Sequence, residues 1–71
     1  MDYTYNYLVK KNDGRYYYND CFCFCSGDSI EFFNVYSGDW VVSRVEYSHG
    51  KKDYYIVEYD DIPLNGLLVR W

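Results

Sequence analysis

The feature that most constrains the fold is the stretch at residues 40–47 (W-V-V-S-R-V-E-Y), in which neighbouring side chains alternate in character. A period of two is typical of a β-strand with one buried and one exposed face. Turn-forming segments precede it at residues 37–39 (Ser-Gly-Asp) and follow it at residues 48–51 (Ser-His-Gly-Lys). Short turns at both ends favour antiparallel neighbours on both sides. The sequence therefore predicts that residues 40–47 form the middle strand of an antiparallel sheet.

Shorter strand-favouring stretches lie on both sides of this middle strand. They are residues 3–9, 15–18, 30–36, 53–59 and 67–71, with residues 21–25 alternating in the same way. In the strand at residues 30–36, Phe32 and Phe33 are expected on opposite faces. No stretch shows the 3.6-residue period of a helix, so the only helical expectation is a single 3₁₀ turn near Pro63.

Short strands at intervals of roughly ten residues are typical of small sandwiches and barrels. For a chain of 71 residues, the predicted fold is all-β. Its form is a small five- or six-stranded antiparallel SH3-like barrel or a strongly bent sheet. The chain is too short for a second core, so residues 1–71 are expected to make a single small β domain.

The composition indicates how such a small core is filled. Aromatic residues make up 24% of the chain, with eleven Tyr, four Phe and two Trp. Their size favours an ordered domain stabilised by heavy side chains. The net charge of −4 disfavours binding to nucleic-acid phosphates, which requires clustered Lys and Arg. No leader pattern or membrane-length apolar run is visible, so a cytoplasmic protein with reduced thiols is expected.

Four short motifs follow one another along the chain. They are C-S-G-D-S-I-E at residues 25–31, W-V-V-S-R-V-E-Y at 40–47, Y-Y-I-V at 54–57 and I-P-L-N-G-L-L-V-R at 62–70. Their order resembles domain-of-unknown-function family 5348, which comprises small bacterial proteins often carried by phages or mobile elements. The similarity covers about residues 14–71, and the chain departs from the family at Ser26 and in its Tyr-rich first strand. The resemblance implies a compact β fold and a mobile-element setting, and it implies no activity.

The side chains that most often carry chemistry are sparse. Cys21, Cys23 and Cys25 lack the C-x-x-C pairs of structural zinc sites, and cysteines two apart on a strand are poorly oriented for a disulfide. They are interpreted as small buried apolar side chains, with a metal or redox role as the alternative. His49 lies in a turn without a paired nucleophile, and most Asp residues lie at turns. The sequence therefore predicts no enzyme, no cofactor and no metal.

The abundance of aromatic residues instead points to a surface that binds a partner. A core of this size cannot hide all of them, and Tyr and Trp are favoured at protein interfaces. The stripe of Tyr3, Tyr5 and Tyr7 is either such a surface, for a partner or for self-association, or the core face of the first strand. Trp40 and Arg44 share a face of the middle strand with Glu46, where a structural and a recognition role both remain open.

Three functions are compatible with these features. The first is a protein-interaction module that binds another protein, or a further copy of itself, through exposed aromatics. The second is an acidic inhibitor that mimics nucleic acid toward a host defence protein. The third is single-stranded nucleic-acid binding by aromatic stacking, which the negative net charge disfavours.

Overall fold

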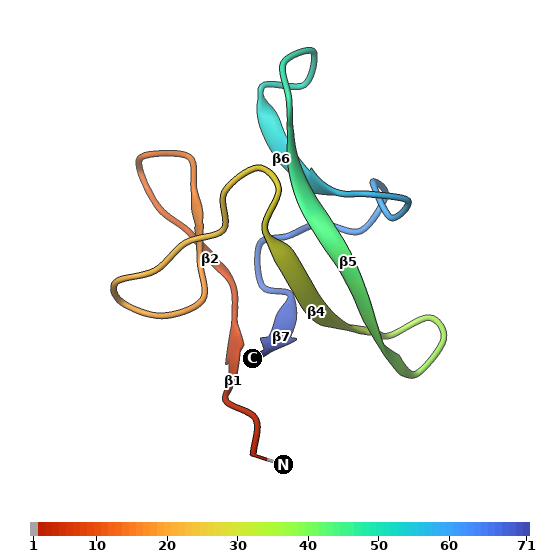
Figure 1. The fold of residues 1–71 in the computed structure, drawn as a ribbon. Helices are drawn as coiled ribbons and strands as arrows, with labels where there is room; N and C mark the ends of the chain where they lie inside the picture. Colours follow the sequence, from red (N-terminus) through yellow and green to blue (C-terminus); the bar gives the residue numbers. More distant parts are fainter. Residues whose placement is uncertain (1) are drawn as a thin grey trace.

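The computed structural model describes residues 2–71, which form an all-β structure of two antiparallel sheets (Figure 1). The strands are β1 (Tyr5–Tyr7), β2 (Val9–Lys10), β3 (Tyr16–Tyr17), β4 (Ser29–Asn34), β5 (Asp39–Ser48), β6 (Asp53–Ile56) and β7 (Leu68–Arg70). Five of them form one sheet in the order β1-β7-β4-β5-β6, and β2 pairs with β3. The predicted all-β class is confirmed, and none of the described residues is helical. Because β1 and β6 are edges, the larger sheet is not a closed barrel.

Strand β5 is the longest strand and is an interior strand of the sheet, between β4 and the edge strand β6 (Figure 1). Its first part pairs with β4, from Asn34 opposite Asp39 to Ser29 opposite Arg44. Its second part pairs with β6, beginning where Val45 is opposite Ile56. The prediction that residues 40–47 have an antiparallel hairpin on each side is therefore confirmed, and the central strand of the five is β4. The change of partner at Arg44 and Val45 lets one strand serve both hairpins.

The core lies against the inner face of this sheet. Strand alternation sends every second side chain inward, and Phe32, Val45, Ile56 and Val69 are all 0% exposed. The remaining buried core residues are Leu8, Tyr16, Ile30 and Leu64. Phe33 is only half-buried, which confirms that the two adjacent phenylalanines point to opposite faces. Burial of these apolar side chains is the main favourable contribution to folding.

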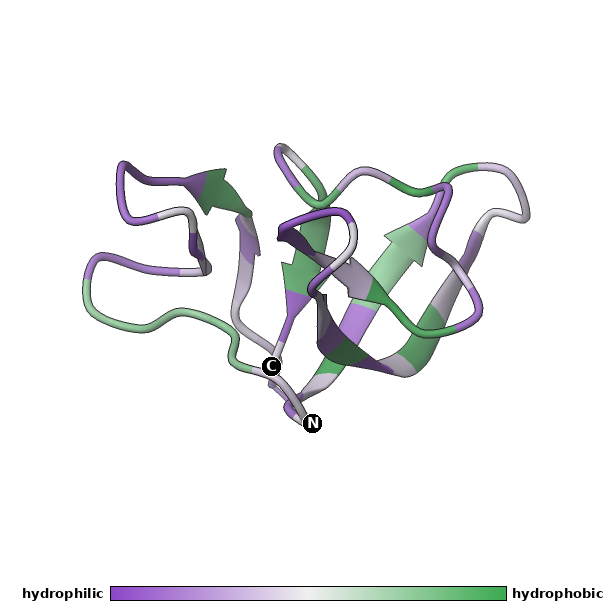
Figure 2. Ribbon diagram, turned by 90° about the horizontal axis from the view of Figure 1, so that it is seen from above, coloured by the Kyte–Doolittle hydropathy of each residue, from purple (hydrophilic) through white to green (hydrophobic). Residues whose placement is uncertain are grey.

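The β2–β3 hairpin lies to one side of the five-stranded sheet (Figures 1 and 2). Its side chains contact β6 through an edge-on pair of the Tyr16 and Tyr54 rings, 6.4 Å apart, and through polar groups. The hydroxyl of Tyr16 donates to both carboxylate oxygens of Asp53 at 3.1 Å, and the Lys10 ammonium lies 3.5 Å from the same carboxylate. The hairpin is therefore attached to the start of β6 by side chains and shares no backbone ladder with it.

Four sequence-based expectations need correction. The strand predicted at residues 3–9 is divided at Leu8, which is 1% exposed, so its two parts join different sheets. Residues 21–25 form no strand and contribute only an isolated bridge between Tyr17 and Cys23. The strand at residues 53–59 ends early because Glu58 adopts a φ of 68° and turns the chain. The segment around Pro63 contains turns instead of a 3₁₀ helix. Residue 1 of the predicted domain lies outside the described residues.

Candidate partner-binding surface

The outer face of the five-stranded sheet, opposite the core, carries the side chains that were predicted to bind a partner. Residues that face each other across an antiparallel pair share one side of the sheet. Tyr5 is opposite Arg70, and Arg70 is opposite Glu31 on its other side. Phe33 is opposite Trp40 in the β4–β5 hairpin. The outer aromatic face, as we name it, comprises Tyr3, Tyr5, Tyr7, Glu31, Phe33, Trp40, Val42, Arg44 and Arg70.

Arg70 occupies the centre of this face. Its guanidinium carbon lies 4.0 Å from the centroid of the Tyr3 ring and 4.2 Å from that of Trp40. Its Nη2 donates to the Glu31 carboxylate at 2.7 Å, and this hydrogen bond raises the pKa of Arg70. A guanidinium held over aromatic rings gains cation–π attraction. Arg70 therefore joins side chains from β4 and β5 to Tyr3, which precedes β1.

The aromatic rings themselves form a continuous series across the strands. The centroid of Tyr5 lies 6.2 Å from Tyr3 and 5.6 Å from Trp40. Trp40 also contacts Phe33 at 5.5 Å with an interplanar angle of 66°. Tilted and edge-to-face arrangements at these distances are favourable for aromatic pairs. The rings are thus held in one arrangement by contacts with each other.

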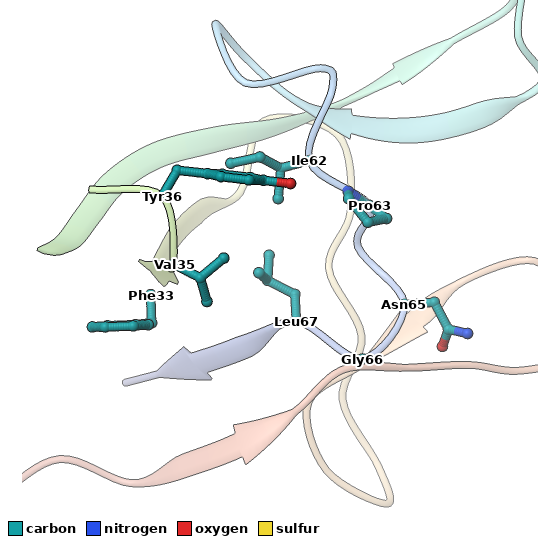
Figure 3. Close-up of a pocket in the computed structure, with 8 residues that line it drawn as sticks. All are labelled: Phe33, Val35, Tyr36, Ile62, Pro63, Asn65, Gly66 and Leu67. Carbon is teal, nitrogen blue, oxygen red and sulfur yellow. The ribbon is translucent and has the colours of Figure 1, made fainter. Parts of the chain in front are cut away.

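A shallow apolar pocket adjoins this series at Phe33. It has a volume of about 180 Å³ and lies between the β4–β5 turn and the loop that leads to β7. Val35 and Leu67 point toward one another across it, and the Tyr36 ring extends toward Ile62 (Figure 3). The lining residues are Phe33, Val35, Tyr36, Ile62, Pro63, Asn65, Gly66 and Leu67. Ligand pockets usually measure about 300–1,000 Å³, so this one is suited to a single apolar side chain.

Comparison with known proteins identifies the family. A family model described as Domain of unknown function (DUF5348) matches residues 4–71. The chain belongs to the DUF5348 family. No curated protein and no solved structure matches it.

The described part of this DUF5348 protein brings most of the predicted site together. Tyr3, Tyr5 and Tyr7 are 36%, 53% and 60% exposed, so the interpretation of this stripe as a core face is wrong. Trp40 is half-buried among Tyr5, Phe33 and Arg70.

Arg44 lies on the same face and differs from the other predicted residues. Its Nε donates to the Glu46 carboxylate at 2.6 Å, and its side chain is 57% exposed. The contacts that centre on Trp40 involve Arg70, which the sequence analysis did not select. The sequence indicates only that Arg70 alternates with the apolar Val69 in the last strand; it does not indicate that this strand lies beside Trp40. Glu31 and Phe33 were not selected either, because their place on this face depends on the same strand order.

The three cysteines of this DUF5348 member are not core residues, contrary to the sequence-based interpretation. Cys21 and Cys25 are exposed and Cys23 is half-buried, all as free thiols. Figure 2 shows their segment as a hydrophobic stretch in a loop at the side of the molecule. Arg15 Nη1 lies 3.4 Å from the Sγ of Cys25. The described residues contain no group of three or more His, Cys, Asp or Glu arranged to hold a metal ion.

His49, in the turn after β5, contacts a neighbouring aromatic ring. The His49 ring packs edge-on against Tyr47 with a centroid distance of 5.1 Å. Within residues 2–71, no helix is long and apolar enough to cross a membrane.

Proposed function

We propose that this DUF5348 protein is a protein-interaction module whose partner binds the outer aromatic face. The observation that carries the proposal is the ordered array of Tyr5, Trp40 and Phe33 around the ion-paired Arg70. Interface centres are enriched in Tyr, Trp and Arg, and residues of these types contribute most of the binding free energy. A contiguous apolar surface of this kind on a small protein is typical of an interaction site.

The surface supplies both an anchor site and a flat contact area. Val35 and Tyr36, beside the pocket, are 72% and 83% exposed, and Val42 on the outer aromatic face is 66% exposed. A large apolar side chain of the partner fills the pocket, while the aromatic rings pack against neighbouring partner residues. Because the rings are already ordered, little side-chain entropy is lost on binding.

The electrostatics of the face favour a protein partner over a nucleic acid. Arg70 is paired with Glu31, and Arg44 is paired with Glu46. Stacking sites for single strands combine aromatic rings with an electropositive groove. Ion-paired arginines on a chain with net charge −4 do not provide that potential.

The proposal includes a setting and a finer description of the fold. We place the protein in the cytoplasm of a bacterium that carries a phage or mobile element, in line with the resemblance of its motifs. We also regard the five-stranded sheet as a strongly bent, open relative of SH3-like barrels, because β5 pairs with both β4 and β6.

Site-specific photo-crosslinking in the native host tests the proposal. A photoreactive aromatic amino acid replaces Val42 or Tyr36, and the matched control carries it at His49, in the turn at the far end of β5. The expected result is one partner protein crosslinked from the first two positions and not from His49. Purified partner should then lose at least tenfold in affinity for Trp40→Ala. Crosslinking that is absent, or equal from all three positions, would overturn the proposal.

A further inference from the structure

Strand β1 is an edge whose outward backbone groups receive no hydrogen bond from another strand among residues 2–71. The N–H and C=O of Thr4 both bond to Trp71, at 2.8 and 2.9 Å, and the N–H of Leu8 bonds to the C=O of Leu67 at 2.8 Å. In an antiparallel ladder, alternate residues direct their backbone groups to opposite sides. Tyr3, Tyr5 and Tyr7 therefore direct theirs away from β7. Among residues 2–71, the structure gives the backbone groups of Tyr5 no partner.

The side chains of this edge are not of the kinds by which proteins prevent pairing with another strand, although the segment after β3 touches β1 where the Asn6 amide donates to the C=O of Tyr18 at 2.9 Å. Features that prevent pairing include Lys or Pro in the strand, a bulge, or a covering loop. Residues 3–9 (Y-T-Y-N-Y-L-V) contain neither a charged residue nor Pro. The N–H of Tyr7 is held only by the adjacent Asn6 side chain, at 2.9 Å. The opposite edge differs, because Asp53 at the start of β6 is bonded to Tyr16 and Lys10 of the β2–β3 hairpin.

We propose that a second copy of this chain pairs with β1, antiparallel and about a two-fold axis at Tyr5. The N–H of each Tyr5 then donates to the C=O of the other, and Tyr3 lies opposite Tyr7 of the second copy. A strand paired with itself in this way makes an isologous interface, in which the same surface serves both subunits. The two five-stranded sheets join into one continuous sheet.

The sequence of the segment favours a second copy as the occupant. Asp2 precedes the strand, and Lys10 and Lys11 follow it. Antiparallel pairing about Tyr5 places Asp2 of each copy opposite Leu8 of the other, two and three residues before Lys10 and Lys11. The ammonium groups of these lysines already contact Asp53 and the Tyr17 ring in their own chain. The uncharged middle places Tyr side chains across from one another, where cross-strand aromatic pairs stabilise a sheet.

The dimer and the proposed function are separable. Pairing requires the backbone N–H and C=O of Tyr5, whereas partner binding centres on Trp40 and Phe33 beside the pocket; the Tyr5 side chain belongs to both surfaces, so the function is tested at Trp40 and the dimer at the Tyr5 backbone. The pairing segment is short, so the interface is small and its dissociation constant is expected at roughly the micromolar level or weaker.

The test compares Tyr5→Pro with Tyr5→Val by analytical ultracentrifugation over a concentration series. Proline lacks the N–H that the pairing needs, and an edge position whose N–H faces solvent tolerates it. Valine keeps the N–H and favours strands. The wild type should show concentration-dependent dimers, Tyr5→Pro should weaken dimerisation at least tenfold, and Tyr5→Val should remain within a few-fold of wild type.

Hydrogen exchange and a second variant distinguish a loss of pairing from a loss of folding in Tyr5→Pro. In the dimer, the Tyr5 amide should exchange more slowly as the concentration rises, while the Tyr54 amide of β6 should not change. Tyr5→Lys keeps the N–H but sets two like charges together across the axis, so its dimerisation should weaken and recover partly with added salt. A wild type that stays monomeric at about millimolar concentration, or a Tyr5→Pro variant that dimerises like wild type, would overturn the proposal.

Discussion

The five-stranded sheet and the β2–β3 hairpin are stabilised by different kinds of interaction. The sheet encloses Phe32 and Val69, which are both 0% exposed. The hairpin is ordered largely by polar contacts around Asp13, which accepts hydrogen bonds from the Arg15 N–H at 2.9 Å and from the Tyr17 hydroxyl at 2.5 Å. Its one buried strand residue is Tyr16.

The two regions should therefore respond differently to perturbation. Apolar burial is insensitive to pH and is lost in large amounts when a core side chain is truncated. Hydrogen bonds at an exposed turn contribute little each and depend on protonation. The sheet should therefore determine global unfolding, and the hairpin should open locally at lower free-energy cost.

The largest effect is expected for Phe32→Ala. Phe32 lies opposite Val41 and Val69 and packs against the Tyr59 ring at 5.4 Å. Truncating a fully buried Phe costs about 3–5 kcal/mol, a large share of the stability of a domain this small. Urea unfolding should show the variant to be marginally folded. Phe33→Ala, one residue along and on the opposite face, is the matched control and should cost much less; equal losses would contradict the assignment of faces.

An intermediate effect is expected where the two regions meet. Tyr16→Phe removes the hydroxyl that bonds to Asp53 and leaves the ring in the core. A hydrogen bond to a partly exposed carboxylate is worth about 1–2 kcal/mol. Hydrogen exchange should show the amides of β2 and β3 opening more readily, with β4 and β7 changed less. Tyr36→Phe, whose side chain is 83% exposed, is the control and should leave both regions unchanged.

The same contrast explains how much of the fold could be predicted from the sequence. Residues 40–47 alternate between faces and are bounded by turns, so local pattern was sufficient to identify β5 as a strand with an antiparallel neighbour on each side. Residues 21–25 alternate equally well, but their place in a loop depends on the Tyr17–Cys23 bridge and on the position of the hairpin. Alternation specifies which residues share a face and not whether a neighbouring strand is present.

The candidate site was predictable to a similar degree. Tyr5 and Trp40 could be selected because a core of this size cannot bury all the aromatic residues, which make up 24% of the chain. Arg70 could not be selected, because its contact with Trp40 requires β7 to lie between β1 and β4. Strand order is a property of long-range pairing, which the sequence pattern of one strand does not contain.

A smaller effect is expected from the backbone conformation at two turns. Glu58, after β6, has a φ of 68°, and Gly14, in the hairpin turn, has a φ of 80°. A residue with a Cβ is strained at positive φ, whereas glycine is not. Glu58→Gly should therefore stabilise the protein by about 0.5–1 kcal/mol, and Gly14→Ala should destabilise the hairpin by about 1 kcal/mol. Thermal unfolding measures both, and shifts of the same sign would contradict the explanation.

The smallest effect is expected from the titration of the hydrogen bond between Tyr17 and Asp13. The bond favours a neutral hydroxyl and an ionised carboxylate, so it raises the pKa of Tyr17 to about 12 and lowers the pKa of Asp13. The Tyr17 contribution to stability is present below its ordinary pKa of about 10 and is lost as the pH rises through about 12. The Asp13 contribution is present above an ordinary carboxyl pKa of about 4 and is lost as the pH falls through its lower folded value.

An NMR titration of the Tyr17 ring checks this prediction and separates the hairpin from the sheet. In the wild type, the Tyr17 ring should titrate above the ordinary tyrosine pKa of about 10, and Asp13→Asn should return it toward that value. Tyr17→Phe should raise the pKa of Asp13 and leave the β4 and β7 amides as protected as before, because their stability depends on buried apolar contacts. If the sheet amides instead lose protection along with the hairpin, the two regions unfold as one unit and the comparison fails. Local loss alone would show that the hairpin depends on a single polar contact while the core remains folded.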